Sequence, residues 1–519
     1  MIRLSAYLSA AILATLGFLH AQTSAPSSFR LEKELSSSSS VTPLSNSVTD
    51  VVVSGSTIWL GTGKGLSRST DAGSTWRNYY GDPSFGEEDV SAIAIHQNEV
   101  WVATAHTTTV DGVDYPEGSG LRYSADRGES WSVIPQPRDS YNIDTLFYNS
   151  KSFIRALGIT TNINNITYDI AATDSAVWIA SYAGMARKST DKGKSWQVVI
   201  IPPDNLNSIS PGDSLKFDVS PVAGNLGLGG NLNHRVFSVY AENWAKVWIG
   251  TAGGINKTTD GGTSWVKFSH QNETAPITGN FVVALRMQSY GGRSIMWAGT
   301  RATDSSEAQG VSFSADSGAT WKTSLIGEFC HNLGFKDSIA YAVTDDGIYR
   351  SPDGGKTWTL SGTIYDVRSK QRITSPQFYG VDAQGENIWF GGQDGTVYTQ
   401  DNNASQFGSA WTILHAAQPL TSVRSTYAYP NPFSPNFEVV RLHYAIVNGL
   451  SKVTIRVFDF GMNLVRTVVS NAVRSGTTEF DEIWDGKDDK GRQVSNGPYF
   501  YQVVIGNSDP LWGKILVLQ

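Results

Sequence analysis

The sequence predicts an all-β protein with two folded parts, a large one built from a repeated unit and a small one after Trp411. Three observations predict it: short alternating runs rich in β-branched residues, a phrase that recurs along most of the chain, and the end of that repeat at Trp411. The 519 residues carry a formal net charge of −7 without a run of Lys or Arg. Nucleic acid and anionic membrane surfaces are therefore poor candidate partners.

The N-terminus has the layout of a secretory signal peptide, which we place at residues 1–21. A basic residue precedes an apolar run over 4–19, and small residues follow that allow cleavage after Ala21 or Ala25. The run is shorter and weaker than the roughly 20 strongly apolar residues of a membrane anchor. We expect an exported protein with no integral membrane span once the signal is removed. Residues 22–45, which include five consecutive serines, are predicted to be a flexible Ser-rich linker.

An eight-residue phrase occurs six times in the large part. The copies read STDAGSTW (69–76), SADRGESW (124–131), STDKGKSW (189–196), TTDGGTSW (258–265), SADSGATW (314–321) and SPDGGKTW (351–358), with a degenerate seventh copy at 399–411. Ahead of each lie an apolar run, a phrase such as VWIGT (247–251) and a stretch such as GINKT (254–258). Each unit thus predicts four short strands. Seven units over 46–418 predict a seven-bladed β-propeller, in which radial repetition leaves only short, protected sheet edges.

The octapeptide residues suit a turn rather than a reaction. The aspartate can accept hydrogen bonds from N–H groups of its own turn, the glycine two residues later can supply a positive φ, and the closing Trp can bury its ring against the neighbouring blade. The aspartates are Asp71, Asp126, Asp191, Asp260, Asp316 and Asp353. The pattern resembles the Asp-box, or BNR-type repeat, of sialidases, sortilin-type receptors, large endoglucanases and photosystem assembly factors. That resemblance implies a structural role, away from the ligand face, and is silent on activity.

Long connections mark the opposite face as the candidate binding face. The links between blades are long at 133–168 and 199–238, and the loop between strands two and three is expanded at 105–119 and 301–309. In a propeller all four emerge on one side, opposite the octapeptides, and long loops on a rigid scaffold often carry function. The candidate binding-face residues are Asp111, Asp114, Tyr115, Glu117, Tyr141, Arg301, Asp304 and Glu307.

No pattern of residues predicts catalysis, a metal or a cofactor. The sialidase family's [FY]-R-I-P signature is missing, the eight His show no H-x-x-H or H-E-x-x-H spacing, and no phosphate-binding Gly-rich loop opens a helix. Cys330, the only cysteine, is predicted to be a buried small residue. We therefore predict no catalytic residue, metal site or cofactor. The alternative is a glycoside hydrolase or lyase with carboxylates from 82–117 and 301–307.

The small part predicts an antiparallel β-sandwich. Residues 419–428 lie in a Pro- and Ser-containing stretch and are predicted as a linker, and six or seven short strands follow over 429–519. YPNPFSP (429–435), WDGKDDKGRQVSNGPYFYQV (484–503) and the closing KILVLQ resemble the Ig-like modules of flagellar hook-capping proteins and of type IX secretion sorting tails. DGKDDKG (485–491) favours a hairpin turn, with calcium left open.

Together these features predict an all-β chain, a seven-bladed β-propeller followed by a small antiparallel Ig-like β-sandwich. The leading functional hypothesis is a secreted or cell-surface, non-catalytic binding protein whose partner is an extracellular glycan or protein. The resemblance of the tail implies a second partner, the outer-membrane secretion machinery. An envelope assembly factor is a further alternative, supported by fold analogy alone.

Overall fold

The computed structural model describes residues 39–40, 42–140, 144–219, 230–369, 371–402, 406–408, 410–416, 420, 422–436, 439–446, 449–475 and 479–518. These residues contain no α-helix; their helical turn is the short 3-10 helix η2, Leu232–His234. The predicted signal peptide at 1–21 lies outside the described residues. Among the residues that the structure describes, no helix is long and apolar enough to span a membrane. The predicted all-β class is confirmed.

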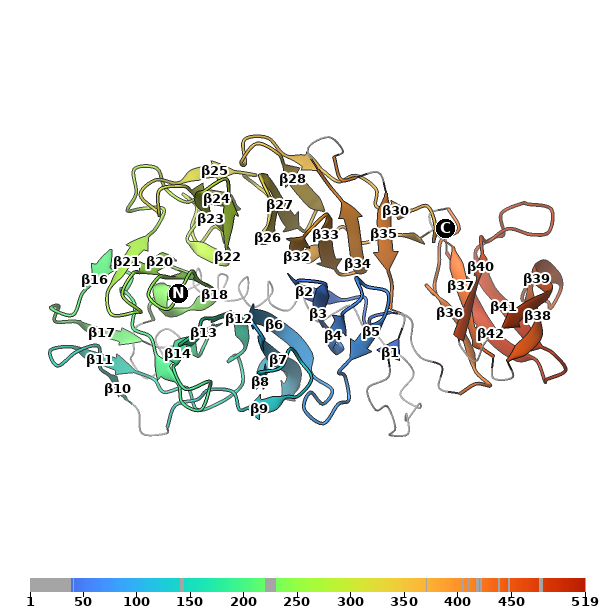
Figure 1. Cartoon of the computed structure of the whole chain (residues 1–519), viewed down its shortest axis with the longest axis horizontal. Helices are drawn as coiled ribbons and strands as arrows, with labels where there is room; N and C mark the ends of the chain where they lie inside the picture. The colour runs from blue at the N-terminus through green and yellow to red at the C-terminus, as the bar shows by residue number, and fades with distance from the viewer. Residues whose placement is uncertain are drawn as a thin grey trace. The chain divides into compact units, whose positions relative to one another are not determined.

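Seven sheets in the described residues each contain four consecutive antiparallel strands, one sheet for each predicted repeat (Figure 1). Blade 1 has β2 (Val48–Ser54), β3 (Thr57–Thr62), β4 (Gly65–Ser69) and β5 (Trp76–Asn78), and blade 2 has β6 (Asp89–His96), β7 (Glu99–Val110), β8 (Val113–Ser124) and β9 (Ser132–Ile134). Blade 3 has β12 (Thr167–Ala172), β13 (Val177–Ser181), β14 (Met185–Ser189) and β15 (Gln197–Val198), and blade 4 has β18 (Val236–Ala241), β19 (Val247–Thr251), β20 (Gly254–Thr258) and β21 (Trp265–Phe268).

The remaining three sheets follow the same meander. Blade 5 has β22 (Phe281–Tyr290), β23 (Arg293–Arg301), β24 (Gly310–Ser314) and β25 (Lys322–Ser324), and blade 6 has β26 (Cys330–Lys336), β27 (Ile339–Thr344), β28 (Ile348–Ser351) and β29 (Thr359–Leu360). Blade 7 has β32 (Phe378–Gln384), β33 (Asn387–Gly392), β34 (Gly395–Gln400) and β35 (Trp411–Leu414). A two-stranded ribbon, β30 (Tyr365–Asp366) with β31 (Gln371–Arg372), lies between blades 6 and 7 in the sequence.

The first strands of the blades form a closed inner ring. Each contacts the first strand of the next blade, and β32 of blade 7 contacts β2 of blade 1 (Figure 1). Trp389 of blade 7 completes the closure by packing with Trp76 of blade 1. At the outer edge of blade 1, β1 (Ser39–Ser40) pairs with β5, so the end of the predicted Ser-rich linker is a fifth strand there.

Each intact octapeptide is the turn between the third and fourth strands of its blade. In 189–196 the Asp191 carboxylate accepts hydrogen bonds from the Ser195 N–H (2.9 Å) and from the hydroxyls of Ser189 (2.8 Å) and Ser195 (2.5 Å). The other five copies repeat these bonds from the residue four positions on. They stabilise the ionised form and lower the pKa of Asp191 to about 2. These aspartates act within their own turns.

Tryptophans of neighbouring blades pack against one another, in agreement with the sequence prediction. Trp178 of blade 3 meets the octapeptide Trp265 of blade 4 edge to face, with 6.3 Å between ring centroids. The same contact joins two further pairs, Trp59 with Trp131 and Trp297 with Trp358. At Gly262, φ is +95° and a Cβ would lie 2.9 Å from Cη2 of Trp178. Both the turn and the neighbouring ring therefore require glycine.

In the degenerate seventh copy the aspartate, Asp401, bonds to the neighbouring blade and not to its own turn. Asp401 is fully buried and accepts hydrogen bonds from Nε of Arg350 (2.6 Å) and from the hydroxyl of Tyr341 (2.7 Å), both in blade 6. The ion pair joins blade 6 to the end of β34, where the intact turn is lost. Burial, reinforced by Asp401, raises the pKa of Tyr341.

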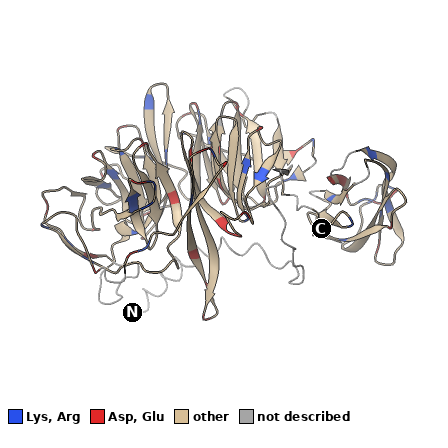
Figure 2. Ribbon diagram, turned by 60° about the horizontal axis from the view of Figure 1, so that its bottom comes forward, with Lys and Arg blue, Asp and Glu red and all other residues tan. Residues whose placement is uncertain are grey.

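The insertions contain paired strands, and they do not all stay on one face. Residues 105–118 continue β7 and β8 as a long paired hairpin whose turn, Asp111-Gly112, has positive φ at both residues. A second hairpin extends β22 and β23 at their turn, which lies on the octapeptide side because it joins strands one and two. Figure 2 shows the two hairpins projecting from opposite faces.

The two long connections between blades pair with each other in a side sheet. Its strands are β10 (Thr145–Leu146), β11 (Phe153–Ala156) and β17 (Lys216–Val219), and β16 (Ser208–Ile209) joins the outer edge of blade 4. The hydroxyl of Tyr148 in this insertion donates to the carbonyl of Thr263, inside an octapeptide. The prediction that every insertion lies opposite the octapeptides is therefore wrong for 133–168. That connection is long enough to run along the edge of the blades.

The C-terminal part is a sandwich of two antiparallel sheets. One contains β36 (Thr426–Tyr429), β37 (Val440–Ala445) and β40 (Glu479–Trp484); the other contains β38 (Leu450–Phe458), β39 (Leu464–Ser475), β41 (Gly497–Ile505) and β42 (Leu511–Val517). Their inner faces bury a core that includes Tyr444, Trp484 and Tyr501. The first strand begins at Thr426, inside the stretch predicted as linker. The segment 485–491 lies between the two sheets, because β40 and β41 belong to different sheets, and it forms a turn that an antiparallel bridge between Lys487 and Gln493 closes.

Candidate functional site

Every first strand carries a β-bulge at the same place, near the end that faces away from the octapeptides. In each blade the register with the second strand shifts across one unpaired residue. The unpaired residues are Thr49, Ser91, Tyr168, Phe237, Val283, His331 and Tyr379. A bulge re-aims the side chain of the extra residue. We call this ring of bulges, where the inner strands begin, the mouth of the propeller.

Aromatic rings run continuously along the mouth from blade 3 to blade 5. Tyr168 and Tyr182 both contact Phe237, with 5.6 and 5.9 Å between ring centroids. Phe237 in turn contacts Phe281 at 4.4 Å. These four side chains are only partly buried, so their edges or faces remain in reach of solvent. Burial raises the pKa of Tyr168 to about 12, so its hydroxyl is protonated at neutral pH.

The series of ring contacts continues to blades 6 and 7 through the guanidinium of Arg301, which stacks between two rings. The Arg301 guanidinium lies 4.0 Å from the ring centroid of Phe329 and 6.0 Å from that of Phe281. Phe329 contacts His331 at 4.2 Å, and His331 contacts Tyr379 at 4.9 Å. We call the rings of Tyr168, Tyr182, Phe237, Phe281, Phe329, His331 and Tyr379, together with Arg235 and Arg301 that stack on them, the aromatic arc.

Two arginines of the arc have no carboxylate partner in the part of the chain that the structure describes. Arg301 makes no hydrogen bond or ion pair there, and burial lowers its pKa while Asp345 opposes that effect. Arg235 stacks on Tyr182, 5.6 Å from the ring centroid, and its buried Nε has no partner. By contrast, His331 pairs with Asp345 at 2.9 Å. The arc thus combines ring surfaces with two unpaired guanidinium groups.

Blades 1 and 2 give the mouth a different chemistry. The bulge residues Thr49 and Ser91 are small, and their hydroxyls donate across to the carbonyls of Val90 (2.8 Å) and Thr167 (2.8 Å) of the next blade. These side chains close the ring where the aromatic residues are missing. Their hydroxyls are therefore used to join blades.

An acidic cluster surrounds one histidine at the base of the β7–β8 hairpin. His106 lies between Glu88 (Nδ1 to Oε2, 2.8 Å) and Glu117 (Nε2 to Oε2, 3.4 Å). The hydroxyl of Ser119, the extra residue of a bulge in β8, is 2.9 Å from Nδ1 of His106 and also donates to Glu88. Burial and the neighbouring Glu88 raise the pKa of Asp89 to about 6.

Buried carboxylates tie the inner strands together beyond the mouth. Asp50, Asp169 and Asp382 each accept a hydrogen bond from a backbone N–H of the next blade. The donors are Ile93 (3.0 Å), Val239 (3.0 Å) and Val53 (2.7 Å) respectively. Arg286 reaches Asp169 at 3.3 Å and contributes an attractive charge to all three. Burial nevertheless raises the pKa of Asp50 and of Asp382 to about 6.

The predicted binding-face residues fall into two separated groups. Asp111, Asp114 and Tyr115 lie along the outer half of the β7–β8 hairpin, where Asp114 accepts a hydrogen bond from the Thr109 hydroxyl (2.6 Å). Glu117 belongs to the acidic cluster. Tyr141 lies outside the described residues.

The second group lies in blade 5, which is not a neighbour of blade 2. Arg301 belongs to the aromatic arc. Asp304 is exposed and accepts hydrogen bonds from the N–H (2.7 Å) and hydroxyl (2.6 Å) of Ser306. Glu307 accepts bonds from the N–H groups of Asn280 (3.0 Å) and Thr303 (2.8 Å). The oxygens of Glu307 therefore hold its own loop to the connection from blade 4.

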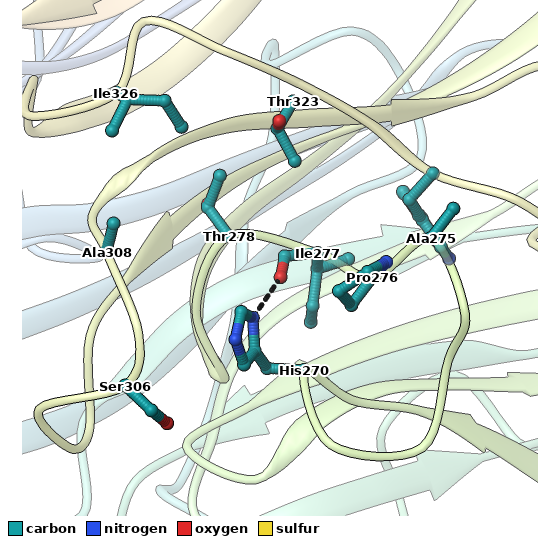
Figure 3. A pocket seen from close by; sticks show the side chains of 10 residues that line it. His270, Ala275, Pro276, Ile277, Thr278, Ser306, Ala308, Thr323 and Ile326 are labelled. Carbon is teal, nitrogen blue, oxygen red and sulfur yellow. Dashed lines mark hydrogen bonds between the residues drawn. The ribbon is translucent and has the colours of Figure 1, made fainter.

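That loop also walls a cavity of about 340 Å³ at the edge of blade 5. Figure 3 shows His270 bonded through Nδ1 to the carbonyl of Ile277 (2.7 Å), with Ser306 and Ala308 from the loop on one side and Ile326 above. The lining is mostly apolar. The cavity lies at the edge of blade 5, and its lining residues are not members of the aromatic arc.

Neither a metal site nor a reactive thiol stands out in the described residues. No group of three or more His, Cys, Asp or Glu side chains there is placed to hold a metal ion. Cys330 is fully buried, its Sγ donates to the Asn332 carbonyl (3.3 Å), and burial raises its pKa to about 12. The prediction of a buried small residue is confirmed. In the segment 485–491, Asp488 pairs with Arg492 at 2.9 Å.

The sequence predicts Arg301 as a binding-face residue but does not predict the other members of the arc. The signal is an aromatic or histidine residue at one position of the inner strand: YDIAA (168–172), FSVYA (237–241), HNLGF (331–335) and YGVDA (379–383), against TDVVV (49–53) and SAIAI (91–95). Aligning the repeats on their first strands, and not on the octapeptide, would have exposed it.

The chain resembles several known proteins over parts of its length. Residues 438–509 match the family model of the FlgD Ig-like domain. No curated protein matches the sequence significantly. Solved structures that resemble the chain include YCF48 bound to D1 peptide (15% identity, 70% of this chain and 97% of that chain, TM-score 0.41). Others are PorZ, a surface component of the type-IX secretion system of Porphyromonas gingivalis (13%, 90% and 64%, 0.32), and a GH74 xyloglucanase from Xanthomonas campestris (14%, 78% and 59%, 0.46).

Proposed function

We propose that this chain is an exported extracellular or cell-surface binding protein whose propeller holds a glycan on the aromatic arc. The arc is the observation that supports this function. Partly buried rings from blades 3 to 6, followed by the buried Tyr379 of blade 7, form one continuous series of contacts with a few polar groups placed along it. Ligand sites combine aromatic side chains with a few polar groups. A sugar ring has an apolar C–H face that packs on an aromatic ring and a rim of hydroxyls that need polar partners.

In this proposal the octapeptides, the Ig-like domain and the signal peptide have separate roles. The octapeptides are structural Asp-boxes that hold the blades together. The Ig-like domain serves as a sorting tail that the outer-membrane secretion machinery recognises, and the signal peptide starts export. The match of residues 438–509 to the FlgD Ig-like domain supports the identity of the tail domain.

The test incubates the full chain with a panel of insoluble polysaccharides and measures both retention and new reducing ends. We expect retention without cleavage, and loss of retention in Phe237→Leu. A matched control is Phe500→Leu, a partly buried ring on the C-terminal sandwich. Equal retention of the wild type and Phe237→Leu would show that the arc is not the site. If no polysaccharide is retained, the glycan proposal is wrong.

A glycoside hydrolase is the second candidate, because Glu88 and Glu117 lie on opposite sides of one imidazole. Paired carboxylates are the general acid and the nucleophile or base of glycoside hydrolysis. New reducing ends that disappear in Glu88→Gln would establish this activity. Reducing ends that persist in that variant would exclude this pair.

A further inference from the structure

The charge on the aromatic arc narrows the class of ligand. This step rests on the proposed function, since it concerns the same surface. Arg235 and Arg301 lie on either side of the Phe237–Phe281 ring pair: Arg235 stacks on Tyr182, which contacts Phe237, and Arg301 stacks on Phe281. The two cations therefore flank one stack of rings.

Neither guanidinium has its charge compensated by a direct partner in the described residues. The partly buried guanidinium of Arg301 has no hydrogen bond or ion pair there, and the Nε of Arg235 is buried without a partner. Two other buried arginines of the propeller pair with carboxylates, Arg187 with Asp139 at 2.9 Å and Arg350 with Asp401 at 2.6 Å. The buried Arg122 instead donates to the carbonyls of Ser84 and Ser119. Buried charges in proteins are generally paired, so two unpaired ones at a solvent-accessible rim indicate a missing anion.

The charged neighbours leave these two groups available. Asp345 attracts Arg301 but is bonded to His331 at 2.9 Å and to Gln377 at 3.3 Å. The acidic cluster of Glu88, Asp89 and Glu117 belongs to blade 2, and blades 3 and 4 lie between it and Arg301. The mouth therefore has a cationic, aromatic part and an acidic part.

We propose that the arc recognises an acidic glycan, with a uronate carboxylate bound by Arg301 or Arg235 and the sugar ring packed on Phe237 and Phe281. A guanidinium presents a planar fork of N–H donors that matches a carboxylate, and such charge-assisted pairs are about twice as strong as neutral ones. The stacking on Phe329 and Tyr182 holds each fork in place, so little side-chain entropy is lost on binding.

Calorimetric titration of the full chain tests this with oligomers of galacturonate, mannuronate and glucuronate, each paired with its carboxyl-reduced neutral counterpart. We expect at least one uronate oligomer to bind about tenfold or more tightly than its neutral counterpart, as one charge-assisted hydrogen bond would give. Rising salt concentration should weaken the affinity for the uronate oligomer and leave the affinity for the neutral oligomer unchanged. Arg301→Gln should reduce the preference, and Arg235→Gln should do the same.

The control variant is Arg293→Gln, an exposed arginine at the tip of the β22–β23 hairpin on the opposite face, which should keep the preference. Equal affinity for acidic and neutral oligomers, no binding of any uronate oligomer, or an unchanged preference in both arginine variants would overturn the proposal. Tight neutral binding that Phe237→Leu abolishes would overturn the acidic preference alone and leave the glycan function standing. Binding of a peptide carboxylate in place of every sugar would overturn both.

Discussion

The two faces of the propeller use the same blades in opposite ways. On one face six octapeptides repeat the same hydrogen bonds. In the degenerate seventh copy, Asp401 instead forms an ion pair with Arg350 of the neighbouring blade. On the other face the seven bulge positions share a backbone geometry but differ in side chain, from Thr49 and Ser91 to Phe237 and Tyr379. Repetition therefore indicates a structural role for the octapeptides, and the variation of side chains at a repeated backbone position is the reason for placing the proposed binding site at the mouth.

The largest effect should come from the packing between blades. Trp297 is fully buried and meets Trp358 edge to face. Trp297→Ala should lower the free energy of unfolding by about 3–5 kcal/mol, because it leaves a cavity at a blade interface. Chemical denaturation followed by intrinsic fluorescence measures it. A loss below about 1 kcal/mol would contradict the interlocking role of these rings.

The inner-ring and octapeptide aspartates should differ in the sign of their pH dependence. Asp50 has a folded pKa of about 6 against an ordinary value of 3.8, so the folded state binds the proton more tightly between about pH 4 and 6. Its contribution to stability is present below pH 4 and is lost as pH rises through 6, by up to about 1.4 kcal/mol per pH unit. Asp50→Asn should remove that slope from unfolding measured between pH 4 and 7.

The octapeptide aspartates should show the reverse slope. The pKa of Asp71, Asp191 and Asp316 is lowered to about 2, so their stabilisation is present above about pH 4 and lost as pH falls toward 2. An unfolding profile without a loss of stability below pH 4 would contradict their role as hydrogen-bond acceptors.

An octapeptide change should cost stability and spare binding. Asp353 accepts bonds from the Thr357 N–H (3.0 Å) and hydroxyl (2.7 Å). Asp353→Ala should lower the free energy of unfolding by about 1 kcal/mol, because the turn is exposed and water replaces part of each bond. Affinity for the retained polysaccharide should stay unchanged in the folded protein. Altered ligand preference would show that the octapeptides take part in recognition.

A change in the arc should do the opposite. Phe237 is partly buried, so Phe237→Leu should cost less than about 1.5 kcal/mol of stability. Binding should fall strongly, since Phe237 contacts Tyr168, Tyr182 and Phe281 and its loss interrupts the arc. Calorimetric titration and thermal unfolding of the same sample separate the two effects.

The smallest effect is expected at the hairpin tip. Asp114 is exposed and bonds only to Thr109 of its own hairpin in the described residues. Asp114→Ala should change stability by less than about 0.5 kcal/mol and leave binding to the arc unchanged. A loss of binding in this variant would move the site outward from the mouth to the β7–β8 hairpin.

Much of the fold can be predicted from the sequence, because the octapeptide and the strand phrase such as VWIGT (247–251) each specify a local backbone conformation. A turn with a fixed Ser/Thr, Asp and Gly can be recognised from eight residues, and each one locates two strands. The side sheet could not be predicted, because β10, β11 and β17 have two to four residues each, and β11 pairs with β17 across 63 positions of chain, from Phe153 to Lys216. The Asp111-Gly112 turn could have been predicted from its Asp-Gly pair.

The candidate site was harder to predict than the fold. In the sequence, Phe237 and Tyr379 cannot be distinguished from other aromatic strand residues. Their special position comes from the β-bulge, and a one-residue register shift has no local signature in the sequence. The loop acids were more conspicuous. The structure shows that Asp304 and Glu307 accept hydrogen bonds within and beside their own loop.

The most direct test of this division measures ligand affinity and unfolding free energy side by side in the full-length wild type, Asp353→Ala and Phe237→Leu. We predict that Asp353→Ala keeps the wild-type affinity and loses about 1 kcal/mol of stability, and that Phe237→Leu loses affinity at a stability cost below about 1.5 kcal/mol. If instead Asp353→Ala loses affinity and Phe237→Leu keeps it, the assignment of structure to one face and recognition to the other is wrong.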